Sequence, residues 1–259
     1  MLISRYRAGP DRTPRADWDA HDYERAAAKI VEQAERRAHA LARLGVNLAG
    51  ARVLEVGCGT GLYSLALASR EVELVAGVDF ALPLFEPGPC GASFRRLASL
   101  VLAQLGLDSD IERALGELPI RLCPMDAREL AFETDSFDLV WSGACLEDVS
   151  NVDVALAELA RVLRPRGRMY HRIDPFFWAR GCHLPGLVDV PWARARLSPD
   201  EYRRLMLDTR NQRSNGTDRL RPIAQPVHRA SVERCLRRGT GRNDPLGGTA
   251  PRLGARPAG

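Results

Sequence analysis

A short apolar segment that runs directly into three alternating glycines constrains this chain more than any other feature. Residues 52–56 (RVLEV) are rich in aliphatic side chains without polar alternation, which is typical of a parallel strand covered on both faces. Gly57, Gly59 and Gly61 then remove Cβ atoms where the backbone must turn sharply and approach a ligand closely. Residues 62–69 (LYSLALAS) have helical spacing, so a helix N-terminus directs its unpaired N–H groups toward the turn. The segment predicts a buried strand that leads into a ligand-binding turn.

The next predicted strand ends in an acidic residue. It covers residues 72–78 (VELVAGV) and is followed by Asp79. A carboxylate at this position can accept hydrogen bonds from two ribose hydroxyls, as in dinucleotide sites. The glycine turn and Asp79 together are far more specific than either feature alone, and they predict a nucleotide-like ligand.

A second acidic residue follows the third predicted strand, residues 120–123. Asp126 is expected to face the crevice in which open α/β sheets bind ligands. There it can accept a hydrogen bond from the exocyclic amine of an adenine while Met125 or Ala127 packs on the ring. Alternatively, or in addition, Asp126 caps a helix that begins at Arg128.

The remaining periodicity predicts an α/β fold. We expect strands at residues 137–142 and 168–174, and helices at 22–44, at 93–105 and after an N-cap at Asn151. Repeated β-α units at this spacing give a doubly wound, mostly parallel, Rossmann-like sheet with an N-terminal helical extension. The predicted apolar face of the last helix holds Val152, Leu156, Leu159 and Leu163.

Four parts are expected along the 259 residues. They are an N-terminal tail and cap helix (1–50), the ligand-binding core (51–174), a cleft-side loop and helix (175–210) and a basic, atypical tail (211–259). The tail is low in aliphatic residues and rich in Gly, Pro and Arg, which predicts disorder. The oligomeric state is left open.

Charge and hydropathy limit the expected partners. Residues 194–259 hold 15 arginines and 6 acidic residues, and such a basic segment can contact nucleic acid. However, Lys29 is the only lysine, which indicates a coding bias toward arginine, and the tail lacks the interleaved aromatics of single-strand binders. No apolar run approaches the roughly 18–20 residues that span a bilayer, and the N-terminus has no run of signal-peptide length. We therefore expect a cytoplasmic protein without a membrane or nucleic-acid partner.

The motifs as a set resemble the class I S-adenosylmethionine-dependent methyltransferases, particularly small-molecule enzymes with a methyltransferase type 11-like domain. The matching segments, in chain order, are VLEVGCGTG, GVDF, PMDA, FDLVWS and LARVLRPRGRM. They cover residues 51–173, close to half of the chain. The resemblance implies S-adenosylmethionine as cofactor and transfer of its methyl group to an O, N or C nucleophile of a small molecule.

The resemblance also implies roles for individual residues. Around the methionine end it places Glu55, which acts through the turn or an ordered water, together with Gly57, Cys58, Gly59, Thr60, Gly61 and Ser142. At the ribose it places Asp79, and at the adenine Phe80, Met125, Asp126 and Ala127.

Catalysis needs a base only if the methyl acceptor must lose a proton. His171, in the carboxyl-terminal half of the fifth strand, is the preferred candidate because histidine titrates near neutral pH. A hydrogen-bonded structural histidine is an equally good interpretation. Weaker candidates on cleft-side loops are Glu147, Asp148, Asp174 and His183. Their spacing matches no strong ligand motif, so no metal is predicted.

Two other functions stay open. A late hairpin of two strands, present in many relatives, cannot be found after Thr209, so a non-catalytic or truncated cofactor-binding protein is the main alternative. A nicotinamide oxidoreductase fits less well. Here the third glycine comes two residues after the second, and Leu62 stands where the dinucleotide fingerprint has Gly or Ala.

Overall fold

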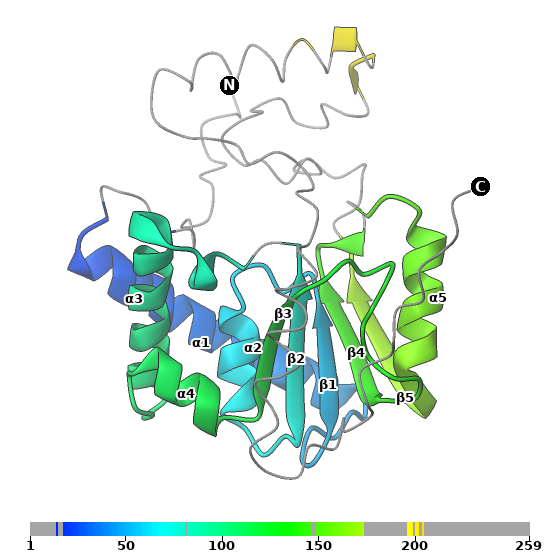
Figure 1. Ribbon diagram of the computed structural model, residues 1–259, viewed down its shortest axis with the longest axis horizontal. Coiled ribbons are helices and arrows are strands. Elements are labelled where there is room, and N and C mark those ends of the chain that lie inside the picture. The colour runs from blue at the N-terminus through cyan, green and yellow to red at the C-terminus, as the bar shows by residue number, and fades with distance from the viewer. Residues whose placement is uncertain are drawn as a thin grey trace, which may run out of the picture.

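The fold centres on a five-stranded sheet, seen in a computed structural model that describes residues 14, 18–80, 82–146, 149–173, 196–198, 200, 201 and 204. All neighbouring strands are parallel, in the order β3-β2-β1-β4-β5 (Figure 1). The strands are β1 (Arg52–Val56), β2 (Leu74–Asp79), β3 (Ile120–Pro124), β4 (Phe137–Gly143) and β5 (Leu163–Arg172). The helices are α1 (Ala20–Arg43), α2 (Leu62–Ala68), the 3-10 helix η2 (Pro83–Phe85), α3 (Gly88–Gln104), α4 (Ile111–Glu117) and α5 (Val152–Val162). The predicted doubly wound sheet is confirmed.

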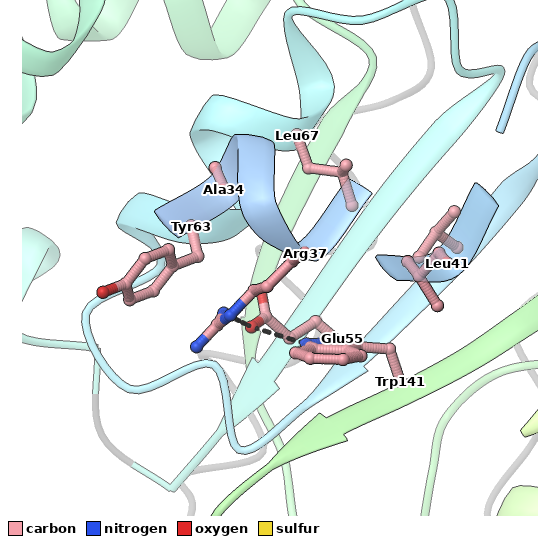
Figure 2. A pocket seen from close by; sticks show the side chains of 8 residues that line it. Ala34, Arg37, Leu41, Glu55, Tyr63, Leu67 and Trp141 are labelled. Carbon is pink, nitrogen blue, oxygen red and sulfur yellow. Dashed lines mark hydrogen bonds and ion pairs between the residues drawn. The ribbon is translucent and has the colours of Figure 1, made fainter. Parts of the chain in front are cut away.

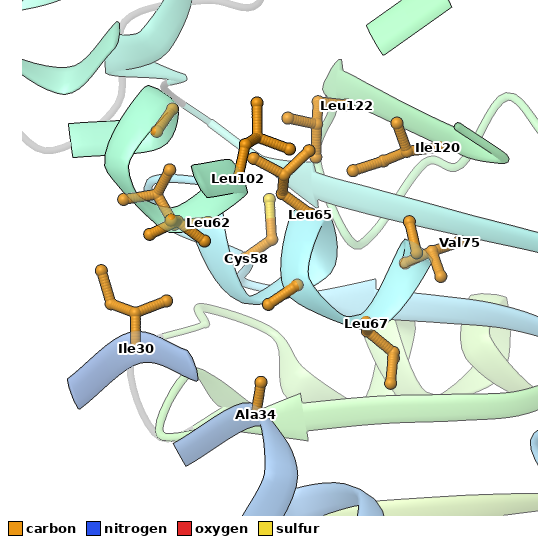
Figure 3. Close-up of a cluster of buried hydrophobic side chains, with 14 of the residues drawn as sticks. Ile30, Ala34, Cys58, Leu62, Leu65, Leu67, Val75, Leu102, Ile120 and Leu122 are labelled. Carbon is orange, nitrogen blue, oxygen red and sulfur yellow. The ribbon is translucent and has the colours of Figure 1, made fainter. Parts of the chain in front are cut away.

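Helices cover both faces of this sheet. Side chains of α1, α2, α3 and α4 form one buried cluster with Val53, Leu139 and Trp141 of the strands, and Figure 3 shows part of it. A second cluster joins Leu54 and Val140 to α5 and to the segment after β3. Successive strand residues point to opposite faces, so β1 contributes to both clusters and is buried throughout. This explains the unbroken apolar pattern of its sequence.

Helix α1 packs against α2 and α3. It begins with a capping box, in which Asp19 and Asp22 exchange side-chain to backbone hydrogen bonds. Its apolar stripe is buried: Ala27, Ile30, Ala34, Ala38 and Leu41 all belong to the core. No helix among the described residues is both long and apolar enough to cross a membrane.

Two helix predictions need correction between β2 and β3. Helix α3 begins at Gly88 and not at the expected residue 93, because proline in a first turn leaves no hydrogen bond unmade. Helix α4 was not predicted, although Asp110 gives it a strong N-cap by accepting from the backbone N–H groups of Glu112 and Arg113.

The predicted face of α5 is confirmed except at one residue. Leu159 is buried and Val152 and Leu163 pack against the second core cluster, but Leu156 is 38% exposed, and Ala155 and Val162 are buried instead. The small Ala155 lets the helix lie against the sheet at a point where a leucine would hold it away. Asn151 occupies the N-cap position in a left-handed conformation, but its side chain makes no capping hydrogen bond.

Strand β5 begins earlier than predicted. It pairs with β4 from Leu163 onward, but the register shifts between the pairs Phe137–Leu163 and Leu139–Arg168. Residues 164–167 therefore bulge out of the ladder, which is where a strand tolerates proline and glycine. Pro165 and Gly167 lie in this bulge.

Several expectations lie largely outside the described residues. These are most of the cleft-side loop and helix at 175–210 and the tail at 211–259. Ser198 and Glu201 exchange hydrogen bonds in the manner of a capping box at the start of a helix.

Gly77 offers a test of the packing between β2 and α2. A Cβ at Gly77 would lie 2.6 Å from Ser64 Oγ and 2.8 Å from a Leu122 methyl carbon. Ser64 cannot easily move, because its hydroxyl donates to Glu55. We predict that Gly77→Ala lowers the free energy of unfolding by ~1–3 kcal/mol, measured in urea. Gly116→Ala in α4 is the matched control, since its Cβ would meet nothing within 4 Å. Equal stability of the two variants would contradict this packing.

Candidate functional site

The carboxyl ends of the parallel strands meet at one edge of the sheet, and the glycine turn lies there. Gly57, Gly59 and Gly61 all have left-handed backbones, with φ of 71°, 58° and 74°. The backbone N–H groups of Gly57 and Cys58 donate to Val78 O at 2.9 and 3.1 Å, so the turn folds over the end of β2. The conformation requires glycine, as the sequence analysis predicted.

The three glycines differ in what surrounds them. A Cβ at Gly57 would lie 2.3 Å from Cys145 Sγ, and one at Gly61 would lie 2.6 Å from a Leu122 methyl carbon. A Cβ at Gly59 would meet nothing within 4 Å. Gly57 and Gly61 therefore let the turn pack closely against its neighbours, and Gly59 is the point at which the turn borders open space.

Asp79 contacts the turn at this open point. The Gly59 N–H donates to Asp79 Oδ2 at 2.8 Å, which fixes the carboxylate beside the tip of the turn. Phe80 follows and is 43% exposed. An acceptor and an aromatic face thus stand next to the glycine turn, as expected for a nucleoside ligand.

Asp126 lies after β3 and is held by Arg128. Two guanidinium nitrogens of Arg128 donate to the carboxylate, with Nε at 3.0 Å from both oxygens and Nη2 at 2.6 Å from Oδ2. These hydrogen bonds lower the pKa of Asp126 below its ordinary value. Met125 and Ala127, on either side, are buried.

The alternative role of Asp126 as a helix cap is wrong. The Glu129 N–H donates to Asp126 O at 3.0 Å, and the Arg128 N–H donates to Asp126 Oδ1 at 2.9 Å. These bonds close a tight turn, and the residues that follow Asp126 do not form a helix. The short side chain of Asp126 stabilises a turn of this type as readily as a helix start.

Glu55 is buried, and its carboxylate points toward α1 (Figure 2). It accepts hydrogen bonds from Ser64 Oγ at 2.5 Å, Trp141 Nε1 at 3.1 Å and Arg37 Nη1 at 3.3 Å. The Arg37 guanidinium also lies 3.9 Å above the ring of Tyr63. Glu55 therefore joins α1, α2 and β4 at the edge of the turn.

Sequence reasoning missed Arg37 and Arg128. Arg37 lies between Ala34 and Leu41, at a position where helical spacing calls for an apolar residue in the buried stripe of α1. A charged residue within an apolar stripe was the available signal. Arg128 carried no comparable signal, because an arginine two residues after an aspartate is common on surfaces.

On the opposite face of the sheet, Ser142 and His171 lie side by side. They are paired in register at the ends of β4 and β5. Ser142 is 1% exposed, and neither its Oγ nor the two ring nitrogens of His171 have a hydrogen-bond partner in the described structure. Burial lowers the pKa of His171 below its ordinary value. The interpretation of His171 as a hydrogen-bonded structural residue finds no bond to support it among the described residues.

The structure thus brings most predicted site residues to one edge of the sheet. The glycine turn, Asp79 and Asp126 line it from β1 to β3, and Ser142 and His171 extend it to β5. The weaker candidates Glu147, Asp148, Asp174 and His183 lie outside the described residues. Within the described part of the chain, no three His, Cys, Asp or Glu side chains are grouped as metal ligands.

Comparison with known proteins agrees with the motifs. A family model described as a methyltransferase domain matches residues 90–171. A phosphatidylethanolamine N-methyltransferase of Cereibacter sphaeroides is 33% identical over 153 residues, covering 59% of this chain and 62% of the relative. A malonyl-[acyl-carrier protein] O-methyltransferase of Methylovorus sp. is 32% identical over 151 residues, covering 57% of this chain and 46% of the relative. A demethylmenaquinone methyltransferase of Staphylococcus aureus is 32% identical over 120 residues, covering 46% and 41%.

The chain spans about half the length of these curated relatives. The parallel sheet, the left-handed glycine turn and the acidic residue after β2 agree with these matches. The chain is similar to methyltransferases, and residues 90–171 match the model of a methyltransferase domain.

Proposed function

We propose that this chain binds S-adenosylmethionine and transfers its methyl group to a small-molecule acceptor. The observation that carries the proposal is the contact of Asp79 with Gly59 at the open tip of the glycine turn. The names of the three relatives support methyl transfer, but their acceptors differ from one another. They therefore do not identify the acceptor of this chain.

The residues present fit the cofactor. Asp79 offers carboxylate oxygens to the ribose hydroxyls, Phe80 offers an exposed ring to the adenine, and Asp126 offers an acceptor to its exocyclic amine. The turn around Gly59, with Cys58 and Thr60, leaves room for the methionine end, and the buried Glu55 acts on it through the turn. When bound, the cofactor supplies a methyl group that is already activated on a sulfonium.

The chain's own task is then to align the acceptor and to exclude water. His171 is the proposed base where the acceptor must lose a proton. Its lowered pKa keeps the ring neutral at physiological pH, so that a ring nitrogen can accept a proton. The cytoplasmic location and the absence of a nucleic-acid partner stay predictions from the sequence.

The first test concerns the ribose. Isothermal titration with S-adenosylhomocysteine should show binding to the wild-type protein, and Asp79→Asn should weaken it by roughly 100-fold. The expected loss follows from two hydrogen bonds to a charged group, each of about 1.5–3 kcal/mol, of which the neutral amide keeps part. Asp153→Asn, an exposed change in the first turn of α5, is the control. Binding of NADH without binding of S-adenosylhomocysteine would overturn the proposal.

A second test concerns the adenine amine. S-inosylhomocysteine has a carbonyl oxygen in place of that amine, so the Asp126 carboxylate should repel it. We expect the wild-type protein to prefer S-adenosylhomocysteine by about tenfold or more, and Asp126→Asn to remove most of this preference. Arg128→Gln keeps the carboxylate and should keep the preference. If Asp126→Asn leaves the preference intact, Asp126 does not contact the amine.

A further inference from the structure

Three buried polar atoms without partners lie together at the ends of β4 and β5. They are Ser142 Oγ and the two ring nitrogens of His171. The two residues are register partners on adjacent parallel strands, so their side chains leave the same face of the sheet about 5 Å apart. An unsatisfied buried polar group is destabilising, and most buried polar atoms have a partner. Three such atoms in one place indicate a binding function.

The surroundings of this pair are otherwise apolar. One step earlier on the same face, Val140 and Met169 pack in the second core cluster, and Val56 of β1 is the register partner of Ser142 on the other side. Ser142 and His171 therefore lie at the carboxyl ends of β4 and β5, beside apolar residues of the same face. Packing does not require a hydroxyl and an imidazole there.

The segment after β4 holds this pair close to the glycine turn. Ala144 has a left-handed backbone with φ of 59°, and its N–H donates to Arg172 O at 2.7 Å. The chain then brings Cys145 against Gly57. A non-glycine residue in this conformation is strained, and such strain is concentrated at functional sites. The pair and the turn are thus parts of one continuous edge.

We propose that Ser142 and His171 together hold a hydroxyl group of the methyl acceptor, so that the reaction is an O-methylation of an alcohol or phenol. The inference rests on the proposed function and names the acceptor class for the same site. It extends the role of Ser142 from a residue beside the methionine end to one that binds the acceptor.

A hydroxyl fits this pair better than other nucleophiles. The acceptor hydroxyl can donate its proton to a neutral imidazole nitrogen and accept from the serine hydroxyl, and its oxygen still keeps one lone pair for attack. An amine nitrogen has a single lone pair, which donation from Ser142 would occupy. A carboxylate has no proton to offer to the accepting nitrogen of His171, and a carbon nucleophile forms neither bond.

The methyl-transfer step balances with these groups. The acceptor O–H bond breaks, its proton passes to His171, and the electron pair of the oxygen forms the new O–CH3 bond. The C–S bond breaks at the same time, and its electron pair stays on sulfur as the thioether. His171 leaves the step as an imidazolium and returns its proton to solvent when the products depart.

The test uses protein saturated with S-adenosylhomocysteine and three probes of matched shape: phenol, benzoate and aniline. NMR titration should show that phenol binds more tightly than the other two. Ser142→Ala and His171→Gln should each weaken phenol binding about tenfold, and the double variant should lose little more, because both bonds hold one oxygen. The affinity of the His171→Gln variant for S-adenosylhomocysteine should change less than threefold. Ser109→Ala and His39→Gln, both at exposed positions, are the controls.

Stability gives an independent measurement without any ligand. If the Ser142 hydroxyl serves binding, Ser142→Ala removes an unsatisfied group, and the urea midpoint should be equal to or higher than that of the wild-type protein. A lower midpoint indicates a structural hydrogen bond and contradicts the inference.

Two results of the binding experiment would overturn this inference alone. One is phenol binding that is absent or indifferent to both substitutions while S-adenosylhomocysteine still binds. The other is tighter, substitution-sensitive binding of benzoate or aniline. Failure of S-adenosylhomocysteine to bind the wild-type protein would instead overturn the proposed function.

Discussion

The left-handed turn between β1 and α2 is the constraint on which the rest of the site depends. Gly57 and Gly61 have no room for a Cβ, so the turn packs directly against Cys145 and Leu122. Only then does the N–H of Gly59 reach the carboxylate of Asp79. A change at either of the two packed glycines would move the open tip of the turn away from Asp79, the proposed ribose ligand.

The two faces of the sheet differ in whether their buried polar side chains have hydrogen-bond partners. Toward α1, Glu55 is fixed by donors from three elements, and Trp141 stacks on Tyr170 with ring centroids 5.2 Å apart. Toward α5, Ser142 and His171 remain without partners in the described structure. The alternation of side chains along β4 therefore separates a satisfied polar network from an unsatisfied pair. The network around Glu55 is suited to stabilising the fold beside the glycine turn. The pair Ser142 and His171 is suited to binding a polar group of a ligand.

Much of the fold could be predicted because it depends on local patterns. The unbroken apolar run of β1, the glycine turn and the stripe of α1 each have one physical interpretation. The exposure of Leu156 in α5 could not be predicted, because Ala155 and Leu156 are adjacent apolar residues and only the packing of the helix on the sheet selects Ala155 for burial. The pairing of Ser142 with His171 was also hidden, since it depends on the bulge at 164–167 that shifts the register of β5.

A structure of the chain with S-adenosylhomocysteine tests the central claim most directly. The account predicts ribose hydroxyls within hydrogen-bond distance of Asp79, the adenine beside Phe80 and Asp126, and the homocysteine end in the space bordered by Gly59. A ligand bound elsewhere, or a ribose that does not contact Asp79, would contradict the account.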